Sequence, residues 1–248
     1  MTATAPRTTP VPKARVTRIA THTFGFDEFR PGQLDVIQSL LRGRDTLAVL
    51  PTGAGKSAIY QIAAMLTDGV TLVISPLIAL QRDQVDSIGE RTVDRAVALN
   101  SSLSDRERTA MLSDIGSGDV RFVFLAPEQL ANPDTIAAID DVAIALVVID
   151  EAHCISEWGH DFRPDYLHLG AVIEGLGHPT ICALTATAAP PVRAEIVERL
   201  GMDDPAIIVQ DFDRPNIRLS VERVDGDEAK RDAILPGSGK RSTSATPS

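Results

Sequence analysis

The sequence predicts an α/β domain in which helices cover both faces of a mostly parallel sheet. Six short apolar runs alternate with longer segments whose apolar residues recur at helical spacing. The runs do not alternate strictly between polar and apolar residues, which is typical of strands buried on both faces. Their repeated strand–helix–strand order indicates parallel strands joined by right-handed crossovers.

The predicted elements follow one another along the middle of the chain. Helices are expected over residues 32–41, from a capping box at Ser104 and Glu107 through residue 115, and over residues 190–200. Ligands of such sheets bind at the carboxyl ends of the strands, so the loops there are the candidate functional segments. The predicted strands are residues 46–50, 70–75, 95–99, 121–125, 143–149 and 180–184.

Composition separates the ends of the chain from the middle. Residues 1–17 and 226–248 are rich in Thr, Ala, Pro, Ser and Gly, so we expect a disordered arm and a disordered tail around one lobe spanning residues 18–225. The net charge of −10 argues against a broad basic face that wraps nucleic acid, although a local contact stays open. Two cysteines exclude a disulfide framework, and no apolar run is long enough to span a membrane, so a cytoplasmic location is expected.

A phosphate-binding loop is predicted between the first strand and a helix. Residues 50–57 read Leu-Pro-Thr-Gly-Ala-Gly-Lys-Ser, with leucine where the general pattern has its first glycine. Gly53 and Gly55 let the backbone turn and present N–H groups to phosphate oxygens, and the helix N-terminus favours an anion. Lys56 would reach the β- and γ-phosphates, and Ser57 would bind Mg²⁺. Gly-Lys-Ser also occurs in ordinary loops, so the prediction depends on the strand and the helix. The candidate phosphate ligands are Thr52, Gly53, Ala54, Gly55, Lys56 and Ser57.

A pair of acids, Asp150 and Glu151, follows a strand that is predicted to be buried. Adjacent carboxylates in that position are costly unless they have partners, and a magnesium ion would supply one. Asp150 would then hold Mg²⁺, Glu151 would orient or deprotonate the attacking water, and Lys56 would complete the catalytic set. A solvated turn is the alternative, but a phosphate loop on what we expect to be a neighbouring strand disfavours it. His153 and Cys154 have no spacing that supplies four zinc ligands, so no zinc is expected.

Seven motifs occur in one order along the chain, and together they resemble the RecQ family of DNA helicases in helicase superfamily 2. The resemblance runs from about residue 18 to about residue 224 and implies a RecA-like P-loop lobe that uses ATP and Mg²⁺. It also implies movement along single-stranded DNA and 3′-to-5′ unwinding of forked duplexes in repair or recombination. The leucine at position 50 agrees with the resemblance, because the family's phosphate loop also lacks the first glycine. The motifs are FGFDEFRPGQ (24–33), PTGAGKS (51–57), SPLI (75–78), DEAHCIS (150–156), WGHDFRP (158–164), LTAT (184–187) and FDRPN (212–216).

The resemblance implies roles for residues near the nucleotide base. Phe26 matches the aromatic residue that stacks on adenine, and Arg30 and Gln33 match groups that contact the base. The amide of Gln33 offers a donor and an acceptor, which suits the adenine edge. Without the resemblance, Phe26 would be interpreted as a core residue.

The resemblance also implies a loop that senses DNA. Trp158, Phe162 and Tyr166 have helical spacing, which by itself favours core packing. Gly159 and Pro164 argue against one continuous helix, and the segment matches the family's aromatic-rich loop. We expect the first two aromatic residues to contact single-stranded DNA and Tyr166 to suit the core. The residues implied in DNA binding and coupling are His153, Trp158, His160, Phe162, Arg163, Thr185 and Thr187. The threonine hydroxyls could bond to Glu151 or His153, although threonine is also common where strands end.

Finally, the resemblance implies a second RecA-like lobe that carries arginine fingers, and residues after 235 do not resemble it. We therefore expect this chain to be a cut or truncated lobe with weak turnover, because an arginine finger contributes about 10³–10⁵ in rate. A non-catalytic module that holds nucleotide or docks on DNA is the second interpretation. A P-loop kinase or GTPase is disfavoured, because no Asn-Lys-x-Asp motif is present.

Overall fold

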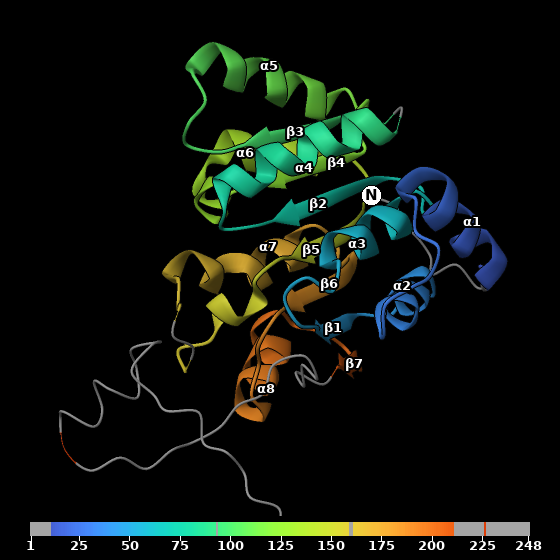
Figure 1. Ribbon diagram of the computed structural model, residues 1–248. Coiled ribbons are helices and arrows are strands. Elements are labelled where there is room, and N and C mark those ends of the chain that lie inside the picture. The colour runs from blue at the N-terminus through green and yellow to red at the C-terminus, as the bar shows by residue number, and fades with distance from the viewer. Residues whose placement is uncertain (1–10, 93, 159–160, 211–225, 227–248) are drawn as a thin grey trace, which may run out of the picture. The chain divides into compact units, whose positions relative to one another are not determined.

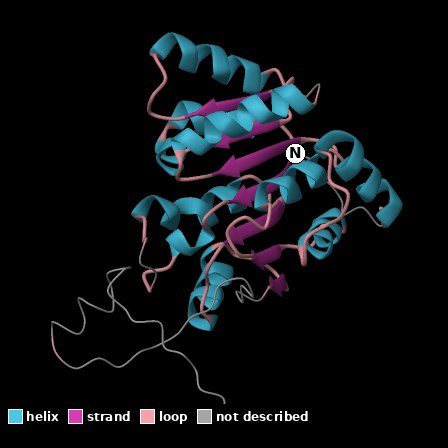
Figure 2. Ribbon diagram, viewed as in Figure 1, coloured by secondary structure: helices cyan, strands magenta, loops and turns pink. Residues whose placement is uncertain are grey.

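The computed structural model describes residues 11–92, 94–158, 161–210 and 226. Its helices and strands all belong to the unit Met1–Phe212, which is distinct from Asp213–Ser248. A seven-stranded parallel sheet in the order β3-β4-β2-β5-β6-β1-β7 lies at its centre (Figures 1 and 2). The predicted fold class is confirmed. No helix of the described residues is both long enough and apolar enough to cross a bilayer.

The six predicted strands are present to within one residue at each end, and the structure adds a seventh. That strand, β7, pairs with β1 at one edge of the sheet, and every second residue of it is exposed. The four residues of β7 are all apolar, but so short a run cannot be told from a helix or loop segment by its pattern alone. The strands are β1 Thr46–Val49, β2 Val70–Ile74, β3 Ala96–Leu99, β4 Phe122–Leu125, β5 Ile144–Ile149, β6 Thr180–Thr185 and β7 Ala206–Val209.

The strand order corrects one expectation. The strand before the phosphate loop, β1, does not pair with β5, the strand before the acid pair, because β6 lies between them. Both β1 and β5 pair in parallel with β6, so all three strands end at the same edge of the sheet. The loops that follow them are therefore brought together around the end of β6.

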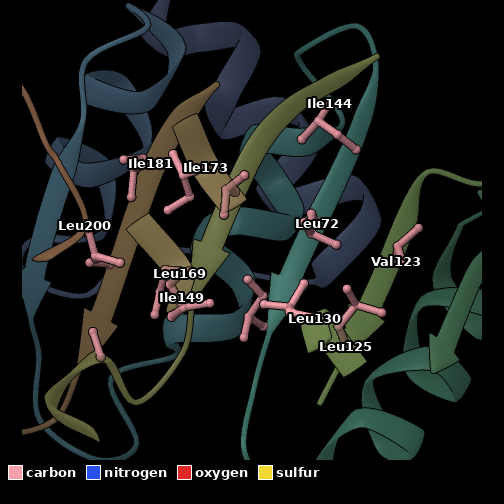
Figure 3. Close-up of a cluster of buried hydrophobic side chains, with 14 of the residues drawn as sticks. Leu72, Val123, Leu125, Leu130, Ile144, Ile149, Leu169, Ile173, Ile181 and Leu200 are labelled. Atoms are coloured by element: carbon pink, nitrogen blue, oxygen red, sulfur yellow. The ribbon is translucent and has the colours of Figure 1, made fainter. Parts of the chain in front are cut away.

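Helices pack on both faces of the sheet and enclose two apolar cores. One core lies under α1–α4 and the other under α5–α8 (Figure 1). Leu72 and Val73 of β2 point into opposite cores, as alternating side chains of a strand must. Figure 3 shows part of the core under α5–α8. The helices are α1 Lys13–Phe24, α2 Gln33–Leu41, α3 Lys56–Ala64, α4 Ile78–Arg91, α5 Asp105–Gly116, α6 Pro133–Asp140, α7 Leu169–Gly175 and α8 Pro190–Arg199, with 3₁₀ turns η1 Pro127–Ala131, η2 Ala152–Ile155 and η3 Pro164–His168.

Helix α1 corrects the expected disordered arm of residues 1–17. The helix begins at Lys13, and Val16 within it is fully buried. Val16 and Ala20 are four residues apart on one face, so both reach the core under α1–α4. The expectation was wrong for residues 13–17, while residues 1–10 and the expected tail, apart from Gly226, lie outside the described residues.

The predicted capping box is present at the start of α5. Ser104 Oγ accepts from the N–H of Glu107, and the Glu107 carboxylate accepts from the N–H of Ser104 at 2.9 Å.

A close approach between α7 and α8 depends on Gly170. A Cβ atom at this position would lie 2.3 Å from the carbonyl oxygen of Arg199. We expect Gly170→Ala to lower the free energy of unfolding by about 1–3 kcal/mol, because backbone must shift to relieve the overlap. Urea denaturation measures this change.

The same helix offers a matched control. A Cβ atom at Gly175 would meet nothing within 4 Å. Gly175→Ala is therefore expected to leave stability unchanged or to raise it by up to about 1 kcal/mol. Equal stability of the two variants would show that the α7–α8 contact tolerates a methyl group.

Candidate functional site

The predicted phosphate loop connects the end of β1 to the first residue of α3. Gly53 and Gly55 have φ values of 81° and 73°, in the left-handed region that favours glycine. A Cβ atom at Gly55 would lie 2.6 Å from Nε2 of Gln33, so a larger residue would also displace that side chain. Helix α3 begins at Lys56 directly after this turn, and its N-terminus points its free N–H groups at the loop.

Lys56 and the acid pair converge at the carboxyl edge of the sheet. The Lys56 ammonium is 3.5 Å from the carbonyl oxygen of Leu50. Its charge partly offsets the rise that burial causes in the pKa of Asp150, and it adds to the fall that the hydrogen bond from His153 causes in the pKa of Glu151. These side chains come from loops that follow two strands separated by β6. The structure therefore brings together the three residues that the sequence predicts as catalytic.

Asp150 is held in a largely buried position at the end of β5. Its N–H donates to the carbonyl oxygen of Ile74 at 2.9 Å, and its Oδ2 accepts from the Ser75 hydroxyl at 3.1 Å. Burial, and next the neighbouring charge of Glu151, raises the pKa of Asp150. A buried carboxylate with too little positive charge around it suits a cation, and oxygen ligands are those that Mg²⁺ prefers. The donor set of Asp150 and Ser57 therefore fits magnesium.

Glu151 and His153 form a second polar cluster beside the phosphate loop. Glu151 has φ 49° and ψ 46°, so the backbone turns sharply directly after Asp150. Nδ1 of His153 is 3.3 Å from Oε2 of Glu151, and a hydrogen bond from His153 lowers the pKa of this carboxyl. The neighbouring Cys154 sulfur and the Glu151 carboxylate raise the pKa of His153 to about 10.

The end of β6 contacts this cluster through Thr185. The Thr185 hydroxyl donates to the carbonyl oxygen of Thr187 at 3.1 Å, so its oxygen accepts from Nδ1 of His153 at 2.9 Å. The Thr185 carbonyl oxygen also accepts from the N–H of Leu50 at 3.0 Å. Of the contacts considered from the sequence, the one between Thr185 and His153 is present. Thr185 thus touches both the phosphate loop and the acid motif.

The residues expected around the base lie beside the loop. Gln33 is almost fully buried, and its Oε1 accepts from the N–H of Arg30 at 2.9 Å while its Nε2 donates to the carbonyl oxygen of Ala54 at 2.8 Å. Gln33 therefore ties the 24–33 segment to the phosphate loop, which the sequence analysis missed. Phe26 is half-buried and stacks on Phe24 with ring centroids 5.9 Å apart. Contacts of these groups with adenine stay predictions.

The aromatic residues separate into two environments. Trp158 is 80% exposed. Tyr166 is fully buried, in agreement with the expectation that it belongs to the core. The Tyr166 hydroxyl donates to the carbonyl oxygen of Asp150 at 3.1 Å, so this core residue also supports the acid motif. Phe162 is half-buried, Arg163 is exposed, and His160 lies outside the described residues.

A polar network that the sequence analysis did not find extends from the acid motif. The amide of Gln81 donates to the carbonyl oxygen of Ser75 at 2.8 Å and accepts from Asn100 at 3.2 Å. Gln81 and Asn100 are buried, and the Ser102 hydroxyl bonds to Asn100 at 2.6 Å. The ends of β2, β3 and β5 are thereby joined. Buried amides spaced about twenty residues apart carry no local sequence signal, so only the fold reveals this network.

A cavity of about 460 Å³ lies away from this site, between η1, α6, η3 and α7. Its lining includes none of the predicted site residues. Within the described ranges, no group of three or more His, Cys, Asp and Glu side chains could hold a metal ion by itself. A magnesium ion bound at Asp150 would need further ligands, such as water molecules or phosphate oxygens.

Comparisons with known proteins agree with this geometry. Residues 30–195 match the family described as DEAD/DEAH box helicase. The chain is 45% identical to the probable ATP-dependent DNA helicase RecS of Bacillus subtilis, covering 86% of this chain and 42% of RecS. It is 42% identical to the ATP-dependent DNA helicase RecQ of Pasteurella multocida, covering 80% of this chain and 31% of that protein. The chain thus spans less than half the length of these relatives.

Solved structures show the same fold at lower identity. The helicase MrfA bound to DNA and AMPPNP matches with a TM-score of 0.61 and 19% identity, over 85% of this chain and 31% of MrfA. The helicase Lhr of Mycobacterium smegmatis, bound to single-stranded DNA and AMP-PNP, matches with a TM-score of 0.62 and 21% identity, over 80% of this chain and 28% of Lhr. The arrangement of strands and helices is therefore a RecA-like one.

Proposed function

The chain belongs to the DEAD/DEAH box helicase family, and on this premise we propose that it is the ATP-binding lobe of a RecQ-type 3′-to-5′ DNA helicase. The observation that carries the proposal is the convergence of Lys56, Asp150 and Glu151 around the end of β6. The lobe would couple ATP hydrolysis to movement along single-stranded DNA and to duplex unwinding. The RecQ-like relatives suggest a role in DNA repair or recombination. They also suggest a location in the cytoplasm or at the nucleoid.

Each residue at the site has a separate task in ATP hydrolysis. The loop N–H groups and Lys56 hold the β- and γ-phosphates. Ser57 and Asp150 would hold Mg²⁺, which offsets negative charge on the phosphates when it is bound. Glu151, with a pKa below its usual value, is ionised at neutral pH and can accept a proton from the attacking water. His153 holds Glu151 in the orientation that this step needs.

The same residues suggest a route between nucleotide and DNA. Nδ1 of His153 contacts Glu151 and Thr185, while its Nε2 lies 3.6 Å from a carboxylate oxygen of Asp161 in the aromatic segment. A change at the phosphates would therefore reach the loop that carries Trp158 through the imidazole of His153.

A module that binds nucleotide without hydrolysing it is the second candidate function. Weak ATP turnover by the 248-residue chain alone is still an expectation from the resemblance.

A DNA titration tests the proposal. Trp158 is the single tryptophan of the chain, so intrinsic tryptophan fluorescence reports on it alone. We expect oligo(dT) to quench this fluorescence. We also expect Trp158→Ala to weaken binding of a labelled oligonucleotide by about 1–3 kcal/mol, the contribution of one base–aromatic stack, or roughly 5- to 150-fold.

The matched control is Ile207→Ala, which removes another large exposed apolar side chain, on the edge strand β7. This variant should bind the oligonucleotide as the wild type does. Unquenched fluorescence, together with equal affinities of the three proteins, would refute a DNA contact at Trp158. Nucleotide binding without any DNA binding would favour the second candidate.

A further inference from the structure

A buried hydroxyl anchors the segment that carries Trp158. Ser156 is fully buried, and its hydroxyl donates to the carboxylate of Glu195 on α8 at 2.5 Å. The same hydroxyl oxygen accepts from the N–H of Trp158 at 3.2 Å. The backbone at the tryptophan is therefore connected to α8 through one side chain.

Glu195 receives two further donors at the same place. The N–H of Glu157 lies 3.5 Å from Oε1 of Glu195, and Nε of Arg199 donates to this oxygen at 2.8 Å. Arg199 also donates to the carboxylate of Glu157 at 2.9 Å. Three consecutive residues, 156–158, are thus tied to one turn of α8, in part by charge-assisted hydrogen bonds.

The charge on Glu195 is part of this arrangement. Burial opposes the charge, but the hydrogen bonds from Ser156 and Arg199 outweigh it and hold the pKa of Glu195 below its usual value. Both carboxylate oxygens can then accept at neutral pH. A glutamine at this position would present an NH₂ group to at least one of the donors.

The Trp158 ring is largely exposed to solvent. Because 80% of the residue is exposed, side-chain packing cannot determine where the ring stands. The backbone at residues 156–158 sets where the side chain starts, and Glu195 holds this backbone. A segment whose backbone is already held loses less conformational freedom when a base stacks on the ring.

The β6–α8 unit holds both ends of η2. Thr185, at the end of β6, contacts His153 near the start of η2, and Glu195 of α8 contacts Ser156 at its end. Helix α8 also packs on η2. The nucleotide side and the aromatic side of η2 are thereby attached to one continuous strand–helix unit.

We propose that Glu195 is a positioning residue that holds residues 156–158, and with them Trp158, in place for single-stranded DNA. The inference rests on the proposed function only in taking Trp158 as the DNA contact. The anchor itself can be tested without DNA.

The experiment compares Glu195→Gln with Glu198→Gln in the 248-residue chain. Both variants remove one carboxylate from α8, but Glu198 is exposed and takes part in none of the anchor's hydrogen bonds. We expect the fluorescence anisotropy of Trp158 to fall in Glu195→Gln and to stay at the wild-type value in Glu198→Gln. Oligonucleotide affinity should fall by about 5- to 100-fold in Glu195→Gln alone, within the range for one lost stack, while ATP affinity stays unchanged.

A second variant reaches the same anchor without changing the charge. Ser156→Ala removes the bridging hydroxyl and should lower the anisotropy as Glu195→Gln does. If both substitutions act through one hydrogen bond, the double variant should lose no more anisotropy than either single one. Urea unfolding of each variant verifies that the lobe stays folded.

The outcomes separate the two claims. Wild-type anisotropy in both Glu195→Gln and Ser156→Ala would overturn the positioning role, whatever DNA does. An equal fall in Glu198→Gln would overturn it as well. Lower anisotropy in the two anchor variants, with no DNA binding by the wild type, would support the anchor and refute the proposed function.

Discussion

Replacement of Lys56 by alanine is expected to abolish ATP binding while the fold stays intact. The ammonium is a positive charge near Asp150 and Glu151, whose carboxylates would otherwise repel a triphosphate. Truncating one partner of a desolvated charge pair costs about 2–5 kcal/mol, so the dissociation constant should rise at least roughly 30-fold. Isothermal titration calorimetry with ATP and Mg²⁺ measures this change.

The fold should not depend on this side chain. Lys56 is the first residue of α3 and is only half-buried, so its removal leaves the apolar cores unchanged. Lys13→Ala, which removes an exposed lysine from the start of α1, is the matched control and should bind ATP as the wild type does. Equal affinity of wild type and Lys56→Ala would count against the assignment of the phosphate loop.

Asparagine at position 150 is expected to remove the effect of magnesium on ATP affinity. In the wild type, Mg²⁺ should strengthen ATP binding, because Asp150 can contribute a charged oxygen ligand. Asp150→Asn keeps the size of the side chain and an acceptor for Ser75, but removes the charge. The gain in ATP affinity that Mg²⁺ gives should fall by at least about 10- to 100-fold. Loss of an outer-shell partner already costs this much at metal sites.

A stability measurement distinguishes this loss from damage to the fold. Burial raises the pKa of Asp150, which means that the charged form is disfavoured in the folded protein. Asp150→Asn should therefore unfold at the same urea concentration as the wild type or at a higher one. Asp140→Asn, at the exposed end of α6, controls for the loss of one acid. An unchanged magnesium effect in Asp150→Asn would place the metal ligand elsewhere.

Much of the site could be predicted because its signals are local. The turn at Gly53 and Gly55 and the adjacent acids after β5 are short patterns whose chemistry depends on spacing along the chain. The strands were also predictable, since runs buried on both faces are almost continuously apolar. Helix α1 was not predicted, because its first residues, 13–17, contain one deeply buried apolar residue, Val16, next to an arm of low complexity.

The sequence by itself determined which residues are the candidates for the chemistry: a lysine after a glycine turn, two acids at the end of a buried strand and an aromatic segment beyond them. The tertiary structure alone decided that β6 separates β1 from β5 and that Thr185 lies between their loops. It also decided that Tyr166 supports Asp150 and that Glu195 anchors Ser156. The reason is physical: strand order and contacts between residues 39 positions apart, such as Ser156 and Glu195, arise from packing across the sheet, which no local pattern encodes.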